Sequence, residues 1–236
     1  MATRLVRHAS EKGPTRLVIS LNAQIFVLAR KIPPLADVIQ RAEEVTLDGI
    51  SVCTGVRLLT DRKVDRIQGV DMVSYLCEQA APYGLRVMLL GGRPGAAEQT
   101  RSLLAERCPG LTLGVNCPPV GFDRSEETLE QVRESIRSFA PDILFVAFGA
   151  PKQELFMERQ IRPLNVPVVM AVGGSFEMIS GMVRRAPVWL QNIGMEWFFR
   201  MLVEPRRLLW RYVSTNTIFL WALFSELISD RFGTAA

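Results

Sequence analysis

Hydrophobic and polar positions follow two different spacings along the first 174 residues of the chain. Short runs of aliphatic and β-branched residues predict strands, and longer segments with apolar residues three or four positions apart predict helices. Strands are expected at 16–21, 44–47, 86–90, 111–115, 143–148 and 166–172. Helices are expected at 22–31, 70–81, 94–108, 125–140 and 152–160. The two kinds of segment therefore alternate along the chain.

This alternation predicts an α/β fold with a Rossmann-like, mostly parallel sheet that is covered by helices on both faces. After Gly174 the pattern changes to helices alone, rich in Trp, Phe, Leu, Met and Arg and interrupted at Pro187 and Pro205. We therefore expect an α/β domain at residues 1–190 and a helical C-terminal appendage at residues 191–236.

The appendage carries the excess of positive charge. The 236 residues include 28 Lys and Arg against 24 Asp and Glu, and the net charge of +4 is too small to indicate a nucleic-acid-binding protein. Between residues 184 and 211, six arginines stand against two glutamates, so the remainder of the chain is neutral. The four tryptophans also lie in the last 48 residues, at positions 189, 197, 210 and 221.

Basic residues beside tryptophans are typical of a segment that lies on a membrane surface. The longest late apolar run, around 218–224, is well short of the ~20 residues needed to cross a bilayer. We therefore expect peripheral attachment. The alternatives are that the apolar residues form the core of a helical subdomain, or that self-association in a homo-oligomer buries them.

The rarer residues disfavour several classes of protein. The chain has four cysteines without CxxC spacing, which we expect to be reduced. Its single histidine, His8, makes a His-based metal site or a Ser/His/Asp triad improbable, and we expect no metal and no cofactor. The first 16 residues are polar and basic, so we expect a tail rather than a signal peptide, and a cytoplasmic protein.

Ligands of parallel sheets bind beyond the carboxyl ends of the strands, so the residues after each expected strand are the candidate site. Ser20 and Asn22 follow the first strand, where Asn22 is equally suited to cap a helix. Asp48 follows the second strand beside a glycine and suits a turn, a helix cap or a catalytic base. Gly91, Gly92 and the residues after them form a glycine-rich turn into a helix, which can bind an anion through backbone N–H groups.

Three further segments carry polar groups in a dense pattern. After the strand at 143–148, small residues precede Lys152 and Gln153, which offer hydrogen-bond donors from a new helix. Arg66 and Asp71 offer a guanidinium for a diphosphate and a carboxylate for a sugar hydroxyl, or else a surface ion pair. The segments 173–177 and 184–187 combine glycines that permit close approach with arginines that can meet phosphate.

Taken in order, these segments resemble the WecG/TagA/CpsF family of bacterial glycosyltransferases, glycosyltransferase family 26. The resemblance covers about residues 18–212 and rests on the joint order of separate motifs. These motifs are Ser20-Leu21-Asn22-Ala23, Asp48-Gly49, Arg66-Ile67-Gln68-Gly69-Val70-Asp71, Leu90-Gly91-Gly92-Arg93-Pro94-Gly95, Phe148-Gly149-Ala150-Pro151-Lys152-Gln153-Glu154, Gly173-Gly174-Ser175-Phe176, Arg185-Ala186-Pro187, and Gly194-Met195-Glu196-Trp197 continuing to Arg200 and Glu204-Pro205-Arg206-Arg207.

The resemblance implies transfer of a sugar from a UDP-sugar to a polyprenyl-diphosphate-linked saccharide at the inner face of the cytoplasmic membrane. The donor would be of the N-acetylmannosamine type, or glucose or a uronic acid, and the product a teichoic acid or an exopolysaccharide. It also implies inversion at the anomeric carbon without a metal, and the sequence has no Asp-x-Asp motif that would hold a cation against the diphosphate.

The resemblance further implies roles for individual residues. Asp48 matches the general base, and Ser20, Arg66 and Gln153 match other positions needed for activity. Substrate binding is implied for Asn22, Asp71, Gly91, Gly92, Arg93, Phe148, Gly149, Pro151, Lys152, Glu154, Gly173, Gly174, Ser175, Phe176 and Arg185. Contact with the acceptor or the membrane is implied for Arg200, Arg206, Arg207 and Arg211.

The chain departs from the family pattern at four positions. Ser20 stands where relatives usually have Thr, Ala23 where Pro is frequent, Gln24 where Glu is common, and Glu177 where Asp is usual. The loss of a carboxylate at Gln24 leaves the donor sugar open. Two other functions compete with transfer: a non-catalytic UDP-binding or scaffold protein of the same fold, and a Rossmann-type oxidoreductase, which the missing GxGxxG motif disfavours.

Overall fold

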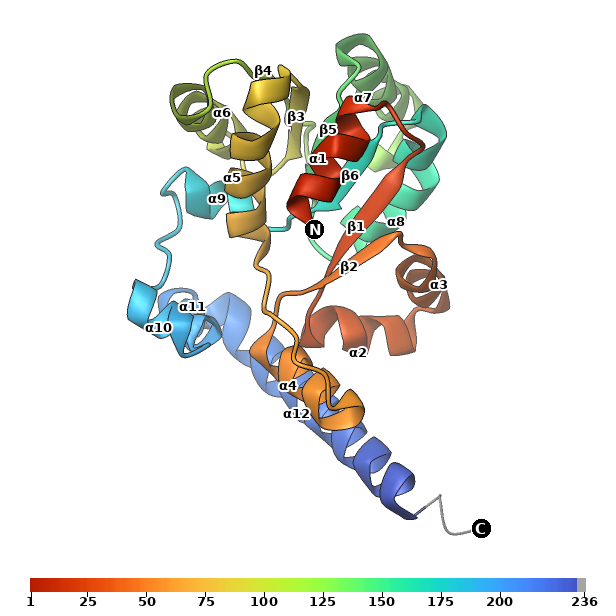
Figure 1. Ribbon diagram of the computed structural model, residues 1–236, viewed down its shortest axis with the longest axis vertical. Coiled ribbons are helices and arrows are strands. Elements are labelled where there is room, and N and C mark those ends of the chain that lie inside the picture. Colours follow the sequence, from red (N-terminus) through yellow and green to blue (C-terminus); the bar gives the residue numbers. More distant parts are fainter. Residues whose placement is uncertain (233–236) are drawn as a thin grey trace. The chain divides into compact units, whose positions relative to one another are not determined.

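The computed structural model describes residues 1–232 and contains one six-stranded parallel sheet with the strand order β2-β1-β6-β5-β3-β4 (Figure 1). The strands are β1 (Arg16–Leu21), β2 (Glu44–Leu47), β3 (Arg86–Gly91), β4 (Thr112–Asn116), β5 (Ile143–Ala147) and β6 (Val168–Ala171). The predicted α/β class and all six predicted strands are confirmed, with ends shifted by at most two residues.

The middle of the sheet is formed by aliphatic strands that are buried on both faces. Every residue of β5 and β6 is buried, as expected of strands covered on both sides. In the parallel register, Leu90 pairs with Val146 and Val146 pairs with Ala171. The last residues of β3, β5 and β6 therefore lie level with one another, and the loops that follow them begin at one edge of the sheet.

Helices cover both faces of the sheet (Figure 1). The helices associated with the sheet are α1 (Ala2–Ser10), α3 (Pro33–Arg41), α5 (Gly69–Ala80), α6 (Ala96–Arg107), α7 (Glu126–Phe139), α8 (Lys152–Phe156) and α9 (Ser175–Ile179). Short helical turns occupy Ala81–Tyr83, Phe122–Arg124, Met157–Ile161 and Arg162–Leu164, the third of these being a π-turn that continues α8.

The N-terminal segment is a helix, so the prediction of a polar tail was wrong. Leu5, Val6 and Ala9 are almost fully buried, and α1 packs against α5. These positions share one helical face, and the polar residues between them face solvent. The ring of His8 is hydrogen bonded to the carbonyl of Pro14 at 2.7 Å. An amphipathic stripe of only three or four residues was hidden by the polar average of the segment.

The chain divides into two compact units, each made of separate stretches of sequence. Unit 1 comprises 1–20, 37–45 and 69–183, and unit 2 comprises 21–36, 46–68 and 184–236. The helices of unit 2 are α2 (Ala23–Lys31), α4 (Ile50–Thr60), α10 (Val188–Asn192), α11 (Glu196–Val203) and α12 (Pro205–Phe232), together with the first residues of α3. Neither α3 nor α4 has a counterpart among the elements that the sequence predicted.

Within unit 2, helix α12 packs against α2 and α4 through a small apolar core. Phe219 is 5% exposed and its ring meets that of Phe26 edge to face, with centroids 5.1 Å apart. A Cβ atom added to Gly55 of α4 would lie 3.1 Å from the Phe219 ring, so the glycine permits α12 to approach closely. The docked face of α12 therefore belongs to a packed core, as the subdomain interpretation predicted.

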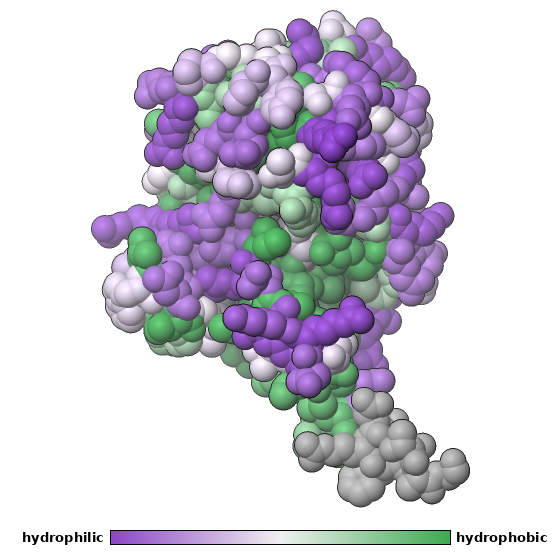
Figure 2. Space-filling view, in the orientation of Figure 1, coloured by the Kyte–Doolittle hydropathy of each residue, from purple (hydrophilic) through white to green (hydrophobic). Residues whose placement is uncertain are grey.

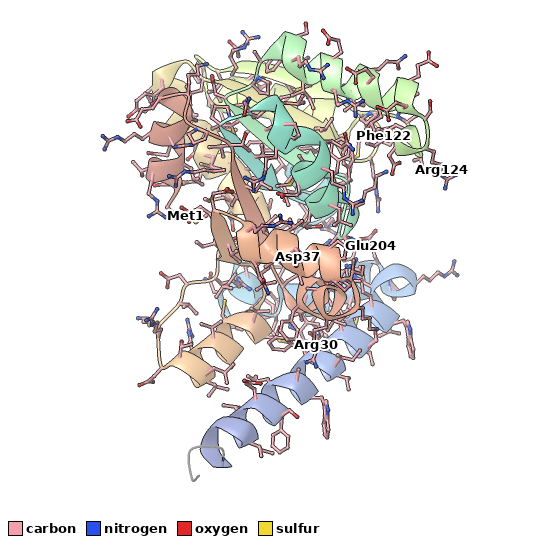
Figure 3. The ribbon with its side chains drawn as sticks, turned by 90° about the vertical axis from the view of Figure 1, so that its right-hand side faces the viewer. Met1, Arg30, Asp37, Phe122, Arg124 and Glu204 are labelled. Carbon is pink, nitrogen blue, oxygen red and sulfur yellow. The ribbon has the colours of Figure 1, made fainter. Side chains whose placement is uncertain are left out.

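Other faces of α12 expose large apolar side chains. Trp210 is 79% exposed, Trp221 71% and Phe224 57%. Figure 2 shows hydrophobic surface, in green, along this helix, and Figure 3 shows ring side chains that project from it. Among residues 1–232, no helix combines the length and the apolar character that crossing a bilayer requires.

We expect Phe219→Ala to lower the free energy of unfolding by about 3 kcal/mol, because it removes a buried ring and leaves a cavity between α12 and α2. Phe224→Ala, the same change at an exposed position of the same helix, is expected to stay within about 0.5 kcal/mol. Urea unfolding of both variants measures the difference. Equal effects would contradict the assignment of the docked face.

Candidate functional site

The loops after β3, β5 and β6 form one group of predicted residues within unit 1. Gly91 and Gly92 both have positive φ, at 90° and 86°. A Cβ atom on Gly91 would lie 2.7 Å from the Phe148 ring, so both the backbone conformation and the space require glycine there. The N–H of Gly92 donates to the carbonyl of Ala147 at 2.9 Å, which fixes the start of this turn against β5.

The glycine-rich turn continues into helix α6. Its N-cap, Gly95, provides no side-chain hydrogen bond, so the first N–H groups of this twelve-residue helix are not capped by a side chain. Arg93 is exposed, and its backbone N–H donates to Glu177 Oε1 at 2.9 Å. Glu177 was noted in the sequence only as a departure from the family, yet its buried carboxylate connects the turn to α9.

The serine and phenylalanine after Gly173 and Gly174 are buried rather than exposed to a ligand. Ser175 is 1% exposed and its hydroxyl donates to the carbonyl of Val172 at 2.6 Å. Phe176 is fully buried and packs beneath Gly92, since a Cβ atom there would meet its ring at 3.1 Å. Only the two glycines of this motif are accessible, with Gly174 the more exposed.

Gln153 connects two of these loops through one side chain. Its Oε1 accepts hydrogen bonds from the N–H groups of Gly149 and Gly173, both at 3.1 Å. Its Nε2 donates to Glu154 Oε1 at 2.8 Å. Pro151 occupies the N-cap position of α8, two residues before Gln153. The predicted residues Gly149, Gln153 and Gly173 therefore meet in one hydrogen-bonded group.

Lys152 is engaged by the residues beside it. Its Nζ lies 2.7 Å from Asp123 Oδ1 and 4.6 Å above the ring of Phe122, which Figure 3 labels. The hydrogen bond from Lys152 lowers the pKa of the Asp123 carboxyl. Phe148 joins the same cluster, with its ring centroid 4.9 Å from that of Phe122. Lys152, Phe148 and Phe122 thus form one packed cluster at the loop that follows β5.

In unit 2, Asp48 is held between two other predicted motifs. Its N–H donates to the carbonyl of Leu21 at 2.9 Å, and the N–H of Ile67 donates to the carbonyl of Leu47 at 2.9 Å. The Asp48 side chain is half-buried. Asn22 caps α2 by accepting from the N–H of Ile25 at 3.0 Å, so the capping interpretation is confirmed. Three segments far apart in sequence therefore converge around Asp48.

The two arginines predicted to meet phosphate make hydrogen bonds within unit 2. Arg66 Nη2 donates to the carbonyl of Gln191 at 2.5 Å. Arg185 Nη2 donates to Gln68 Oε1 at 2.9 Å, and Arg185 Nε lies 3.6 Å from Glu196 Oε1. Gln68 Nε2 in turn donates to Glu196. This network of arginine, glutamine and buried glutamate fixes α10 and α11 to the segment that carries Arg66.

The remaining predicted residues are distributed over both units. Ser20 is buried, and its hydroxyl lies 3.4 Å from the carbonyl of Ala171. Asp71 is exposed in the first turn of α5. Of the C-terminal arginines, Arg206 is exposed, Arg200 and Arg211 are half-buried, and the side chain of Arg207 lies outside the described part of the structure. Arg211 packs over the ring of Tyr212, 5.4 Å from its centroid.

In the part of the chain that the structure describes, no group of three or more His, Cys, Asp or Glu residues is arranged to bind a metal ion. The four cysteines are free. Burial raises the pKa of the thiols of Cys53, Cys108 and Cys117.

Glu154 is the most buried carboxyl group of the site. It is 0% exposed, its Oε2 has no hydrogen-bond partner in the described structure, and burial raises its pKa above the ordinary value of 4.5. The folded protein therefore retains this proton to higher pH than the unfolded chain. Between the ordinary and the raised pKa, the folded state binds more protons, so stability falls as the pH rises through that window.

We expect Glu154→Gln to remove this dependence, because the amide cannot ionise. The ordinary pKa of a glutamate is about 4.5, and that of Glu154 is raised in the folded protein. As the pH rises from the ordinary toward the raised pKa, the free energy of unfolding of the variant should increase relative to that of the wild type. Below that window the difference should be smallest and constant. Urea unfolding at a series of pH values tests this, with Glu106→Gln at an exposed position as the control. A difference independent of pH would contradict it.

Comparison with known families adds one finding. A family model described as "Glycosyl transferase WecG/TagA/CpsF family" matches residues 1–232.

Proposed function

The chain belongs to the WecG/TagA/CpsF glycosyltransferase family, and we propose that it transfers a sugar from a UDP-sugar to a polyprenyl-diphosphate-linked saccharide. It is a glycosyltransferase of cell-surface polysaccharide synthesis. The donor in our proposal carries N-acetylmannosamine, glucose or a uronic acid. The observation that supports the proposal best is the family match across 1–232.

Binding of the donor is assigned to unit 1. The turn at Gly91 and Gly92 leads into the N-terminus of α6, whose N–H groups and partial positive charge suit a diphosphate. The exposed Arg93 adds a full positive charge at the same turn. Glycine at 149 and 173 leaves open space where a Cβ atom would stand, since nothing lies within 4 Å of that position. These features favour a nucleotide diphosphate over a neutral ligand.

Asp48 is assigned as the general base. Its carboxylate would take the proton of the acceptor hydroxyl while that oxygen forms a bond to the anomeric carbon. The bond from the anomeric carbon to the UDP oxygen breaks on the opposite face, and its electron pair leaves with UDP, so the configuration inverts. Arginine side chains and helix N-termini would stabilise the charge on the leaving diphosphate, and the sequence has no Asp-x-Asp to hold a metal there.

The acceptor would be reached at the inner face of the cytoplasmic membrane. Trp210 and Trp221 are more than two-thirds exposed on α12, and Arg206 is exposed in its first turn. Exposed indoles and arginines are the side chains that bind anionic lipid surfaces. A lipid-linked acceptor stays in the bilayer, so an enzyme bound there would meet it in two dimensions. Self-association is the competing way to cover this apolar surface.

We expect Asp48→Asn to reduce transfer at least 100-fold, because the amide cannot accept the proton. The assay offers a panel of UDP-sugars and a short-chain polyprenyl-diphosphate N-acetylglucosamine, with EDTA present. UDP binding, measured by calorimetry, should be unchanged.

Asp37→Asn, at an exposed position labelled in Figure 3, is the matched control. A silent Asp48 change in an active enzyme would overturn the role of Asp48. UDP binding without transfer from any donor to any acceptor tested would favour the non-catalytic scaffold.

We expect Trp210→Ala and Trp221→Ala each to weaken binding to anionic phosphatidylglycerol vesicles about tenfold, since each removes an exposed indole from the lipid interface. Added salt should weaken wild-type binding further. Vesicle co-sedimentation measures both effects. The control is Tyr83→Ala, at a ring that is 59% exposed on unit 1. Unchanged binding in the tryptophan variants, with a concentration-dependent change of mass, would favour self-association instead.

A further inference from the structure

Gln153 and Glu154 form a buried polar pair in the first turn of α8, the helix that follows β5. Gln153 is 4% exposed and Glu154 0%. The Glu154 carboxyl accepts from Gln153 Nε2 at 2.8 Å, and its other oxygen has no partner in the described structure. Neither oxygen of Glu154 forms an ion pair with a basic side chain among the described residues. Burying a carboxyl group without a counter-charge costs free energy of folding. We therefore expect Glu154 to serve a hydrogen bond that requires an acceptor at this position.

The hydrogen bond that requires this acceptor is the one from the Gln153 amide, whose orientation it determines. Its oxygen faces two backbone donors, the N–H groups of Gly149 and Gly173. A rotated amide would place its NH₂ group against both donors and leave the two N–H groups without an acceptor. The Glu154 oxygen accepts only from the NH₂ side of the amide. It therefore selects the orientation in which one oxygen joins the loop after β5 to the loop after β6.

We infer that Glu154 is a positioning residue: by holding the Gln153 amide in one orientation, it fixes the two loops that begin at Gly149 and Gly173. Glu154 is 0% exposed, so it does not make the direct substrate contact that the family resemblance implies for it, and acts through Gln153 instead. The significance of this for catalysis rests on the proposed function, in which these loops bind the donor. The hydrogen-bond arrangement itself does not depend on that proposal.

Two substitutions separate the hydrogen bond from the packing. Glu154→Gln keeps an oxygen acceptor of the same shape. Glu154→Leu keeps most of the volume but accepts no hydrogen bond. Hydrogen exchange of the full-length protein, followed by mass spectrometry, measures the protection of the peptides that contain Gly149 and Gly173. Glu106→Leu, at an exposed position of α6, is the matched control.

We expect Glu154→Gln to retain wild-type exchange in both loops and to keep kcat for sugar transfer within threefold. Glu154→Leu should raise exchange at least tenfold in both loops together and lower kcat at least tenfold. Equal exchange in the Gln and Leu variants would overturn the inference. If the wild type transfers no sugar, the proposed function fails, while the exchange result still decides the role of Glu154.

If a Glu154 variant does not fold, the inference can still be tested on the wild type, through the solvent exchange of the Gln153 side-chain amide. The side-chain NH₂ signals of Gln153, observed by ¹⁵N NMR and assigned with Gln153→Leu, should exchange with solvent at least tenfold more slowly than those of the exposed Gln99. Exchange as fast as that of Gln99 would show that the amide is not held, and would overturn the inference.

Discussion

The parallel register of β3, β5 and β6 places the ends of three strands at one edge of the sheet, and the candidate donor site in unit 1 depends on this constraint. Loops that begin there must satisfy their backbone N–H groups without a further strand. The chain does this with side chains: Glu177 accepts from Arg93, and Gln153 accepts from Gly149 and Gly173. The polar residues after the strands therefore shape the loops before they can serve a ligand.

In unit 2, charged side chains also connect segments that are distant in sequence. The segment of Arg66 and Gln68 is connected to α10 and α11 through Gln191 and through the buried Glu196. Arginine is suited to this task because its planar guanidinium can serve several acceptors at once. Residues expected to bind phosphate thus also hold the C-terminal helices, and a bound anion would compete with these protein acceptors.

The elements of the sheet were predictable because their residues are apolar in unbroken runs. β5 and β6 are buried throughout, and their short length and the glycine and proline that bound them favour strands over buried helices. Helices α1, α3 and α4 were not predicted. Leu5, Val6 and Ala9 make too narrow a stripe to raise the average hydrophobicity of α1, and only Val52, Cys53 and Gly55 of the eleven residues of α4 are buried.

The sequence by itself determined the α/β class, the order of the strands along the chain and the family, because apolar spacing and motif order are local properties. It also identified Asp48, Gln153 and the glycine turns as candidates. Only the tertiary structure decided how they are used. It buried Ser175 and Glu154, gave the oxygen of Gln153 to two loops, and divided the faces of α12 between core and surface. Such roles depend on burial and on which segments the fold brings together: Gly173 and Gln153, for example, are 20 residues apart along the chain, a separation that a local pattern does not contain.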